Sequence, residues 1–245
     1  MRAGSGWRVA QVRRCAGVNR ADGATLASEQ NAGWHLGMQE ILFGMLDPLV
    51  AKRQINRILD AGCGTGYLAK LLEQRYQAPA FAVDSEQPGL SYARRMNRRR
   101  LAQCDVRELP FRPNSFDLVL SMDVVAGLAP GEELRAFAEL SRVLARHGLL
   151  AVRVAAFDHL HSLPSELAHE RQRFTKTRLR HAVEAQGLYI VRCTYVNTLP
   201  APVVDAPWLE RALNAPLALE AKLLKAGWSL PFGQSLMLIA EKSGT

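Results

Sequence analysis

The sequence predicts an α/β fold in which helices cover both faces of an open, mostly parallel sheet. Short apolar runs alternate with helix-like segments along the chain, and the connections between them are short. Residues 115–122 are almost continuously apolar, which is typical of a central strand buried on both faces. A glycine turn at residues 62–66 and a carboxylate, Asp84, each follow a short apolar run. This spacing is typical of a half-site for an adenosine-containing ligand.

Each predicted strand is a short run rich in apolar residues. The predicted strands are residues 57–61, 80–84, 101–104, 115–122, 149–155, 188–195 and 234–241. Helices are predicted where apolar residues recur every three or four positions, from near Ser28, after the glycine turn, and at 88–97, 132–144, 177–186 and 217–225. We expect Pro48 to end the first helix, Gly148 to end the helix at 132–144, and Gly187 to end the helix at 177–186. Met96 and Leu134 are expected to face the core.

The composition predicts one main domain. With 245 residues, of which 48% are hydrophobic and 22% charged, the chain has an ordinary globular composition. We expect the domain to span residues 28–245. Residues 1–27 are basic and lack the apolar core of a secretory signal, so we interpret them as a poorly ordered tail; the alternative is an arm that folds over the active site. No run approaches about twenty apolar residues, and we expect no membrane span.

The cysteines indicate a reducing compartment. Cys15, Cys63, Cys104 and Cys193 lie far apart and form no C-x-x-C pair. This spacing argues against a zinc site and against a disulfide scaffold, and it favours the cytoplasm. Among the histidines of residues 156–176 no set has the spacing of metal ligands, so we predict no metal.

The net charge of +8 raises the question of an acidic partner. Arginines and lysines cluster at residues 94–100 and 171–180. Neither cluster is interleaved with aromatic residues that could stack on bases, as single-strand binders require. The sequence therefore argues against a nucleic-acid partner, and it does not define the oligomeric state.

The glycine spacing separates this turn from the common nucleotide loops. Gly62, Gly64 and Gly66 fall at every second position, unlike the G-x-G-x-x-G of dinucleotide-binding folds. No Lys-Ser or Lys-Thr follows, so the turn is not a phosphate-binding P-loop. With Asp60 in front, the turn resembles motif I, D-x-G-x-G-x-G, of the class I S-adenosylmethionine-dependent methyltransferases. The likeness extends over about residues 28–242 and is strongest toward bacterial enzymes that act on small molecules.

The resemblance implies a Rossmann-like, seven-stranded sheet whose last strand enters antiparallel. It also implies an N-terminal lid helix and substrate-side insertions at residues 156–176 and 198–230, the second before the last strand. The cofactor would be S-adenosyl-L-methionine and the product S-adenosyl-L-homocysteine. In the family, Asp84 would accept both ribose hydroxyls and Asp105 would meet the adenine amino group. The residues that the resemblance assigns to the cofactor are Asp60, Gly62, Cys63, Gly64, Asp84, Ser85, Cys104, Asp105, Val106 and Met122. We interpret Cys63 as a small side chain packed under the cofactor rather than a nucleophile.

The residues expected around the methyl acceptor differ from the pattern of this methyltransferase family. Many relatives carry a Glu-His pair just after the fourth strand, whereas residues 125–128 here read Val-Ala-Gly-Leu. Because this pair is missing, either another residue carries out catalysis or the pocket is wider and takes a bulkier substrate. A hydroxyl acceptor needs a general base, and the candidates for it are His159, His161 and His169. The candidates for the walls of the acceptor site are Trp34, His35, Phe157 and Tyr195. Arg171 and Arg173 either grip an anionic group of the substrate or belong to a solvated approach to a helix.

The main hypothesis is an S-adenosylmethionine-dependent methyltransferase that acts on an oxygen or a nitrogen of a small organic molecule. Two alternatives stay open. An RNA or protein acceptor is favoured by the positive charge, and a non-catalytic, S-adenosylmethionine-binding partner subunit is favoured by the apolar residues at 125–128.

Overall fold

The computed structural model describes residues 33–156, 170–198 and 207–244, with side chains from residue 35 and, in the last range, from residue 216. The predicted tail at residues 1–27 lies outside these ranges. So do residues 157–169 of the first predicted insertion and residues 199–206 of the second. No helix in the ranges described is long and apolar enough to cross a membrane.

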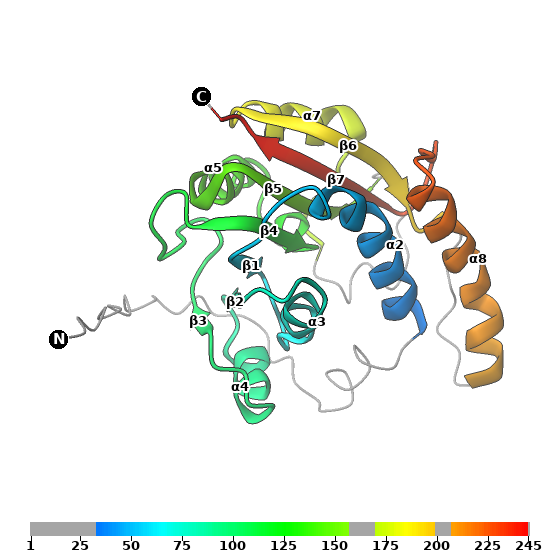
Figure 1. The fold of residues 1–245 in the computed structure, drawn as a ribbon. Helices are drawn as coiled ribbons and strands as arrows, with labels where there is room; N and C mark the ends of the chain where they lie inside the picture. Colours follow the sequence, from blue (N-terminus) through cyan, green and yellow to red (C-terminus); the bar gives the residue numbers. More distant parts are fainter. Residues whose placement is uncertain (1–32, 157–169, 199–206, 245) are drawn as a thin grey trace.

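Seven strands of the described chain form one sheet in the order β3-β2-β1-β4-β5-β7-β6 (Figure 1). The strands are β1 Ile58–Ala61, β2 Ala80–Asp84, β3 Leu101–Gln103, β4 Phe116–Met122, β5 Leu144–Ala155, β6 Leu188–Val196 and β7 Ser235–Lys242. β1 to β5 pair in parallel, and β7 enters antiparallel between β5 and β6. The predicted mostly parallel sheet, with its antiparallel last strand, is confirmed.

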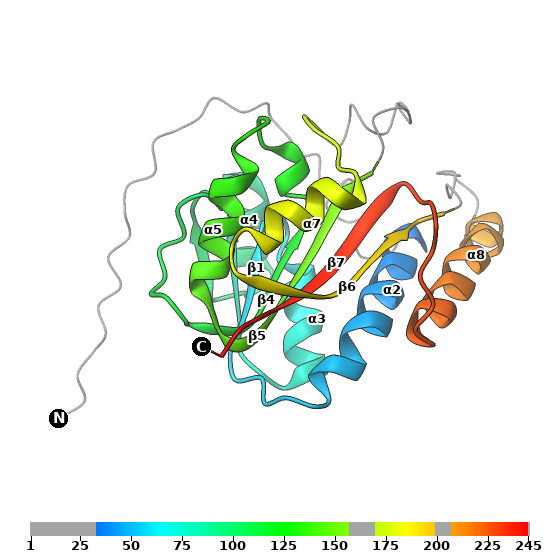
Figure 2. The same cartoon turned by 90° about the horizontal axis from the view of Figure 1, so that it is seen from above.

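Helices cover both faces of this sheet (Figure 2). The helices on one face are α2 Gly33–Val50, α3 Tyr67–Tyr76, α4 Gln87–Arg95 and α8 Pro207–Lys225. Those on the other face are α5 Glu133–Val143 and α7 Lys176–Glu184, with a 3₁₀ turn, η1 Val125–Gly127, before α5.

Alternate strand residues supply the two apolar cores, as expected for strands buried on both faces. Ile58 and Leu118 pack with Met38 of α2, whereas their neighbours Leu59 and Val119 pack with Phe137 of α5. Because β1 to β5 run the same way, their carboxyl ends meet at one edge of the sheet. Ligands of open α/β sheets bind at that edge.

The first helix does not end at Pro48, as the sequence suggested. α2 continues to Val50 with Pro48 in its last turn. Proline lacks only its own N–H and there removes a single helical hydrogen bond, so the helix is completed beyond it. α2 is also a packed layer of the core: Met38, Ile41 and Leu46 are at most 2% exposed.

The predicted end of the helix at 132–144 was also wrong. α5 ends at Val143 and the chain enters β5 at Leu144 directly, so Gly148 lies inside the strand. A Cβ on Gly148 would lie 2.8 Å from the carbonyl oxygen of Ala145, which explains the glycine there. Met96 and Leu134 are 54% and 49% exposed and do not face the core.

The last helix is longer than predicted. α8 begins at Pro207 rather than at Leu217, and it includes Pro216. It packs along α2, where Gly37 and Gly44 leave room: a Cβ on Gly37 would lie 2.8 Å from Leu217. This close contact extends the α2 layer of the core with Leu217 and Leu224.

A buried carboxylate joins α8 to the end of β6. Glu220 is 3% exposed and accepts hydrogen bonds from the backbone N–H of Asn197 at 2.6 Å and of Thr198 at 3.1 Å. The hydroxyl of Thr198 donates to the same carboxylate at 2.9 Å. Glu220 therefore satisfies three donors where β6 leaves the sheet.

Glu220→Ala is expected to lower the free energy of unfolding by about 2–4 kcal/mol, because it leaves buried donors without an acceptor. Urea denaturation followed by circular dichroism measures this change. Glu40→Ala, at an exposed position of α2, is the control and should change the free energy by less than about 0.5 kcal/mol. Equal effects of the two substitutions would contradict the role of Glu220.

Candidate functional site

The glycine turn is closed onto the end of β2. The backbone N–H groups of Gly62 and Cys63 donate to the carbonyl oxygen of Val83 at 2.7 and 2.9 Å. The N–H of Gly64 donates to Oδ2 of Asp84 at 2.8 Å. Gly62 has a φ of +96°, which favours glycine. The two segments that the sequence singled out are thus joined directly.

Asp84 and Ser85 lie at the carboxyl end of β2, beside the end of β3. The N–H of Glu86 donates to Oδ1 of Asp84 at 2.8 Å, and the N–H of Cys104 donates to the backbone oxygen of Asp84 at 3.0 Å. Asp84 is half-buried and Ser85 is exposed. The structure therefore brings the residues predicted at 84–85 and at 104–106 to one edge.

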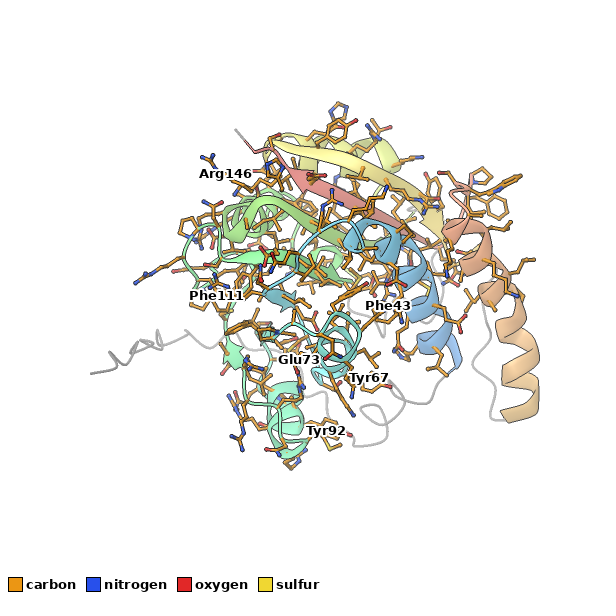
Figure 3. All side chains as sticks on the ribbon, in the orientation of Figure 1. Phe43, Tyr67, Glu73, Tyr92, Phe111 and Arg146 are labelled. Atoms are coloured by element: carbon orange, nitrogen blue, oxygen red, sulfur yellow. The ribbon has the colours of Figure 1, made fainter. Side chains whose placement is uncertain are left out.

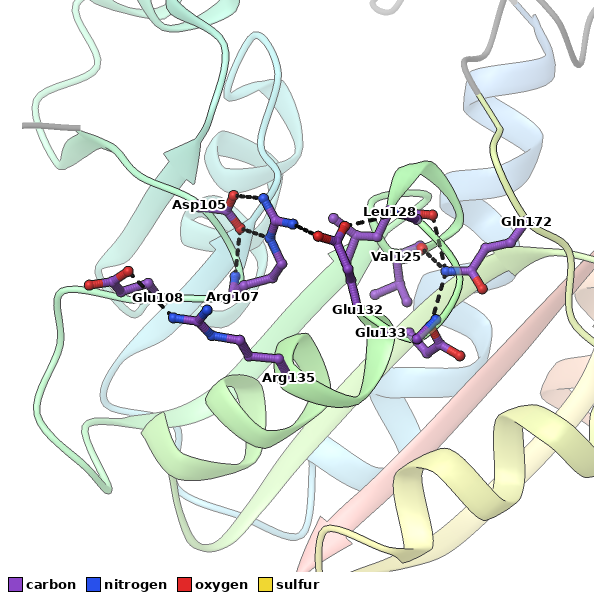
Figure 4. A network of polar contacts seen from close by, with 11 residues as sticks. Asp105, Arg107, Glu108, Val125, Leu128, Glu132, Glu133, Arg135 and Gln172 are labelled. Carbon is purple, nitrogen blue, oxygen red and sulfur yellow. Dashed lines mark hydrogen bonds and ion pairs between the residues drawn. The ribbon is translucent and has the colours of Figure 1, made fainter. Parts of the chain in front are cut away.

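Asp105 is held by an arginine that the sequence analysis did not single out (Figure 4). Arg107 donates to Oδ1 of Asp105 from its backbone N–H at 2.8 Å and from Nε at 2.9 Å, and it also pairs with Glu132. These hydrogen bonds from Arg107 hold the pKa of Asp105 below its usual range. The carboxylate is therefore ionised and fixed in orientation. The side chains of Cys104 and Val106 face the core.

A cavity of about 230 Å³ opens beside the glycine turn. Its walls come from α2, the turn, the start of α3 and the ends of β4 and β5. The residues that line it are His35, Met38, Gln39, Leu42, Asp60, Gly62, Cys63, Gly64, Tyr67, Leu68, Met122, Asp123 and Arg153. Tyr67 is the first residue of α3 (Figure 3). Five of the residues predicted to bind the cofactor, and His35 from the predicted acceptor wall, thus share one cavity.

The sequence did not predict two charged residues that line the cavity, Asp123 and Arg153. Arg153 lies on β5 with its side chain 13% exposed, and its Nε donates to the two carboxylate oxygens of Asp123 at 3.0 and 2.9 Å. Asp123 follows β4 with a φ of +61°. The available signal was Arg153 itself, because a lone charged residue interrupts an otherwise apolar strand at residues 149–155.

Cys63 is buried, and burial raises the pKa of its thiol well above the usual range. Burial likewise raises the pKa of Cys104 to about 12. Both stay protonated at neutral pH, and a thiol is a poor nucleophile. The structure supports the packing role that the sequence suggested for Cys63.

The structure does not describe most of the predicted acceptor-side residues. His159, His161, His169 and Phe157 lie outside the described residues. The backbone of Trp34 is in the first turn of α2, but its side chain is outside them as well. Tyr195 packs against the cluster formed by α5 and α7, on the opposite face of the sheet from the cavity.

Val125 and Ala126, which stand where many relatives carry the Glu-His pair, are packed in the interior and leave no wider pocket. Val125 and Ala126 are at most 1% exposed. The N–H groups of Arg171 and Gln172 donate to the carbonyl oxygen of Ala126, and the side-chain amide of Gln172 donates to that of Val125 at 3.3 Å (Figure 4). The idea of a pocket enlarged here is wrong, because a neighbouring segment covers the turn.

Several arginines of the two basic clusters make structural contacts. Arg173 donates to the carbonyl oxygen of Ala156 at 3.1 Å and pairs with Glu170 at 2.7 Å, so its guanidinium is committed to its own loop. Arg98 and Arg100 both pair with Glu73 of α3 at 2.8 Å. They precede β3 and therefore lie toward the amino ends of the strands, away from the cavity.

His35 is a neutral base in this setting. Burial, followed by the nearby charge of Arg153, lowers the pKa of His35 below 6.5, whereas Asp123 opposes the shift. Below pH 6.5 the His35 ring is therefore protonated more readily in the unfolded chain than in the folded protein. The contribution of His35 to stability is present above that pH and is lost as the pH falls.

We expect the free energy of unfolding of the native protein to fall, relative to that of His35→Asn, between about pH 8 and about pH 5. Urea titrations of both proteins at the two pH values measure the difference. Nuclear magnetic resonance of the His35 ring should give a pKa below 6.5. A ring pKa above that value, or parallel pH dependence of the two proteins, would refute the assignment.

Comparisons with known proteins agree with this geometry. Residues 59–152 match the family model described as a methyltransferase domain. The malonyl-[acyl-carrier protein] O-methyltransferase of Geobacter sulfurreducens is 34% identical over 148 residues, which cover 54% of this chain and 55% of that protein. The trans-aconitate 2-methyltransferase of Deinococcus radiodurans is 35% identical over 130 residues, which cover 51% of this chain and 48% of that protein. The chain thus spans about half the length of these curated relatives.

The fold has many solved counterparts. An S-adenosylmethionine-dependent methyltransferase from Clostridium acetobutylicum superimposes with a TM-score of 0.64 at 14% identity, over 91% of this chain and 98% of that chain. The matched residues 59–152 contain the glycine turn, Asp84, Asp105 and most of the parallel strands. These residues therefore match a methyltransferase domain, and the described chain has the fold of a solved S-adenosylmethionine-dependent methyltransferase.

Proposed function

We propose that the protein transfers the methyl group of S-adenosylmethionine to an oxygen, or to a nitrogen, of a small organic molecule. The observation that carries this proposal is the glycine turn closed onto Asp84 at one side of a cavity whose other walls come from α2, β4 and β5. Of the two relatives described above, one is named an O-methyltransferase, which supports an oxygen acceptor, and the other is named for trans-aconitate, which supports a small acceptor.

The residues present fit S-adenosylmethionine. A Cβ on Gly62 would lie 1.9 Å from Cγ2 of Val124, so the turn can pack against the end of β4 only because Gly62 has no side chain. One carboxylate can accept two charge-assisted hydrogen bonds from a vicinal diol, and Asp84 is the carboxylate at the end of β2. Asp84 would hold the ribose, Asp105 the adenine amino group, and Gly62 and Gly64 the methionine moiety.

When bound, S-adenosylmethionine supplies a methyl group already activated by a sulfonium. The protein then has mainly to exclude water and to position the acceptor in line with the bond between sulfur and methyl. Met38, Leu42 and Leu68 give the cavity its apolar walls. Its volume of about 230 Å³ lies below the ~300–1,000 Å³ of whole-ligand pockets, which suits the reacting part of a small acceptor.

Asp84→Asn is expected to weaken the binding of S-adenosylhomocysteine by about tenfold or more, because a neutral amide replaces a charge-assisted acceptor of the ribose hydroxyls. Isothermal titration calorimetry measures this. Asp117→Asn is a matched control: Asp117 accepts the N–H groups of Asn56 and Arg57 at 2.8 and 3.0 Å at the opposite end of the sheet. Unchanged affinity in Asp84→Asn, or an equal loss in Asp117→Asn, would count against the proposed ribose site.

Gly62→Ala is expected to abolish measurable binding of S-adenosylhomocysteine, because the new methyl group collides with Val124 and the turn must move. Gly131→Ala is the control. Gly131 also has a positive φ, +94°, but nothing lies within 4 Å of its added Cβ. Differential scanning fluorimetry with and without S-adenosylhomocysteine should show a ligand-induced rise in Tm for Gly131→Ala and none for Gly62→Ala. A normal rise for Gly62→Ala would contradict the site.

A further inference from the structure

Resting on the proposed binding of S-adenosylmethionine, we propose that Arg107 is a positioning residue that holds the Asp105 carboxylate in the orientation that accepts the adenine amino group. Arg107 acts on the adenine side of the site and not on the methyl acceptor. It follows β3 and lies between two carboxylates, those of Asp105 and Glu132, and its guanidinium donates to both (Figure 4).

The guanidinium of Arg107 is engaged through all three of its nitrogens. Nε donates to Oδ1 of Asp105 at 2.9 Å, Nη2 donates to Oδ2 of the same carboxylate, and Nη1 donates to Glu132. The planar fork therefore fixes both oxygens of Asp105 at once, which the point charge of a lysine does not do. An arginine held by two carboxylates of its own chain is suited to support another residue rather than to bind a ligand itself.

Asp105 keeps room for a further donor. A carboxylate has about four acceptor positions. Oδ1 accepts the backbone N–H and Nε of Arg107, whereas Oδ2 accepts Nη2 alone among the groups of the described residues. The side chain of Asp105 is 32% exposed, at the same edge of the sheet as Asp84. Oδ2 can therefore accept the amino group of an adenine whose ribose is bound by Asp84.

Glu132 anchors Arg107 to the segment that follows β4. It comes just before α5, and its Oε2 accepts the backbone N–H of Ala129 at 3.1 Å while its Oε1 accepts from Arg107. The contacts from Asp105 through Arg107 to Glu132 thus join the loop after β3 to the loop before α5. A side chain that is already held in this way loses less rotamer freedom when a ligand binds.

The charge of Asp105 depends on the same contact. Hydrogen bonds from Arg107 lower the pKa of the Asp105 carboxyl, whereas burial opposes this shift. An ionised carboxylate can only accept hydrogen bonds, so it never presents an O–H donor to the amino group. Arg107 therefore gives the adenine amino group an acceptor of fixed charge and fixed direction.

The test measures, by calorimetry, the binding of S-adenosylhomocysteine and of its 6-deamino analogue, in which purine replaces adenine. We expect the native protein to bind S-adenosylhomocysteine at least about tenfold more tightly, because the analogue lacks the donor to a charged acceptor. Arg107→Gln should reduce this preference to less than about threefold by weakening the binding of S-adenosylhomocysteine and not that of the analogue. Arg107→Lys, a milder change that keeps the charge but loses the fork, should lower the preference in the same direction.

Arg135→Gln is the matched control. Arg135 lies beside the network and pairs with Glu108 at 3.5 Å rather than with Asp105 (Figure 4). This variant removes a positive charge from the same region without releasing the Asp105 carboxylate. Its preference for S-adenosylhomocysteine should equal that of the native protein, and a loss as large as that in Arg107→Gln would contradict a specific role of Arg107.

A residue that acts through Asp105 predicts a coupling between the two positions. In Asp105→Asn the preference for S-adenosylhomocysteine should already be small, and adding Arg107→Gln should not reduce it further. If Arg107 had only a general structural role, Arg107→Gln would weaken the binding of both ligands, and it would do so equally with and without Asp105→Asn. That result would overturn the proposal.

The remaining failures can be told apart. An unchanged or larger preference in both Arg107→Gln and Arg107→Lys overturns the role of Arg107. Equal affinity of the native protein for the two ligands overturns recognition of the amino group by Asp105 but leaves the binding of S-adenosylmethionine intact. Failure of the native protein to bind either ligand refutes the proposed function itself.

Discussion

The hydrogen bonds that close the glycine turn onto β2 are the constraint on which the site depends. Two N–H groups of the turn share the carbonyl oxygen of Val83, and a third is bound by Asp84. A turn with glycines at every second position can make this closure because its backbone adopts left-handed conformations without a side chain in the way. The same closure fixes Asp84 beside the turn, so the folding of this edge also positions the carboxylate that we propose holds the ribose.

The charged groups differ between the side of the site at β2 and β3 and the side at β4 and β5. On the side of β2 and β3 lie the carboxylates of Asp84 and Asp105, and Arg107 keeps Asp105 ionised and oriented. On the side of β4 and β5, a guanidinium is held inside the cavity by Asp123. Between the two sides lie apolar walls and a buried, protonated Cys63. A site of this kind relies on positioning and on electrostatics, since no described group in it is a strong nucleophile.

The sequence predicted the sheet and the positions of the glycine turn and Asp84 because both follow local rules. Apolar runs, the glycine spacing and the carboxylate after the second run are visible in the chain itself. The ends of helices were harder: Pro48 stays inside α2 and Gly148 inside β5, because packing against the sheet overrides the usual stop signals. The Asp123–Arg153 pair joins two strands that are adjacent only after folding, and the covering of Ala126 by the segment at Gln172 is equally long-range. No local spacing encodes such contacts.

The most direct test of the account is a crystal structure of the protein with S-adenosylhomocysteine. The account predicts both ribose hydroxyls within hydrogen-bond distance of the Asp84 carboxylate and the sulfur facing the cavity that contains Arg153. A ligand bound away from Asp84, or one whose sulfur points away from that cavity, would contradict it.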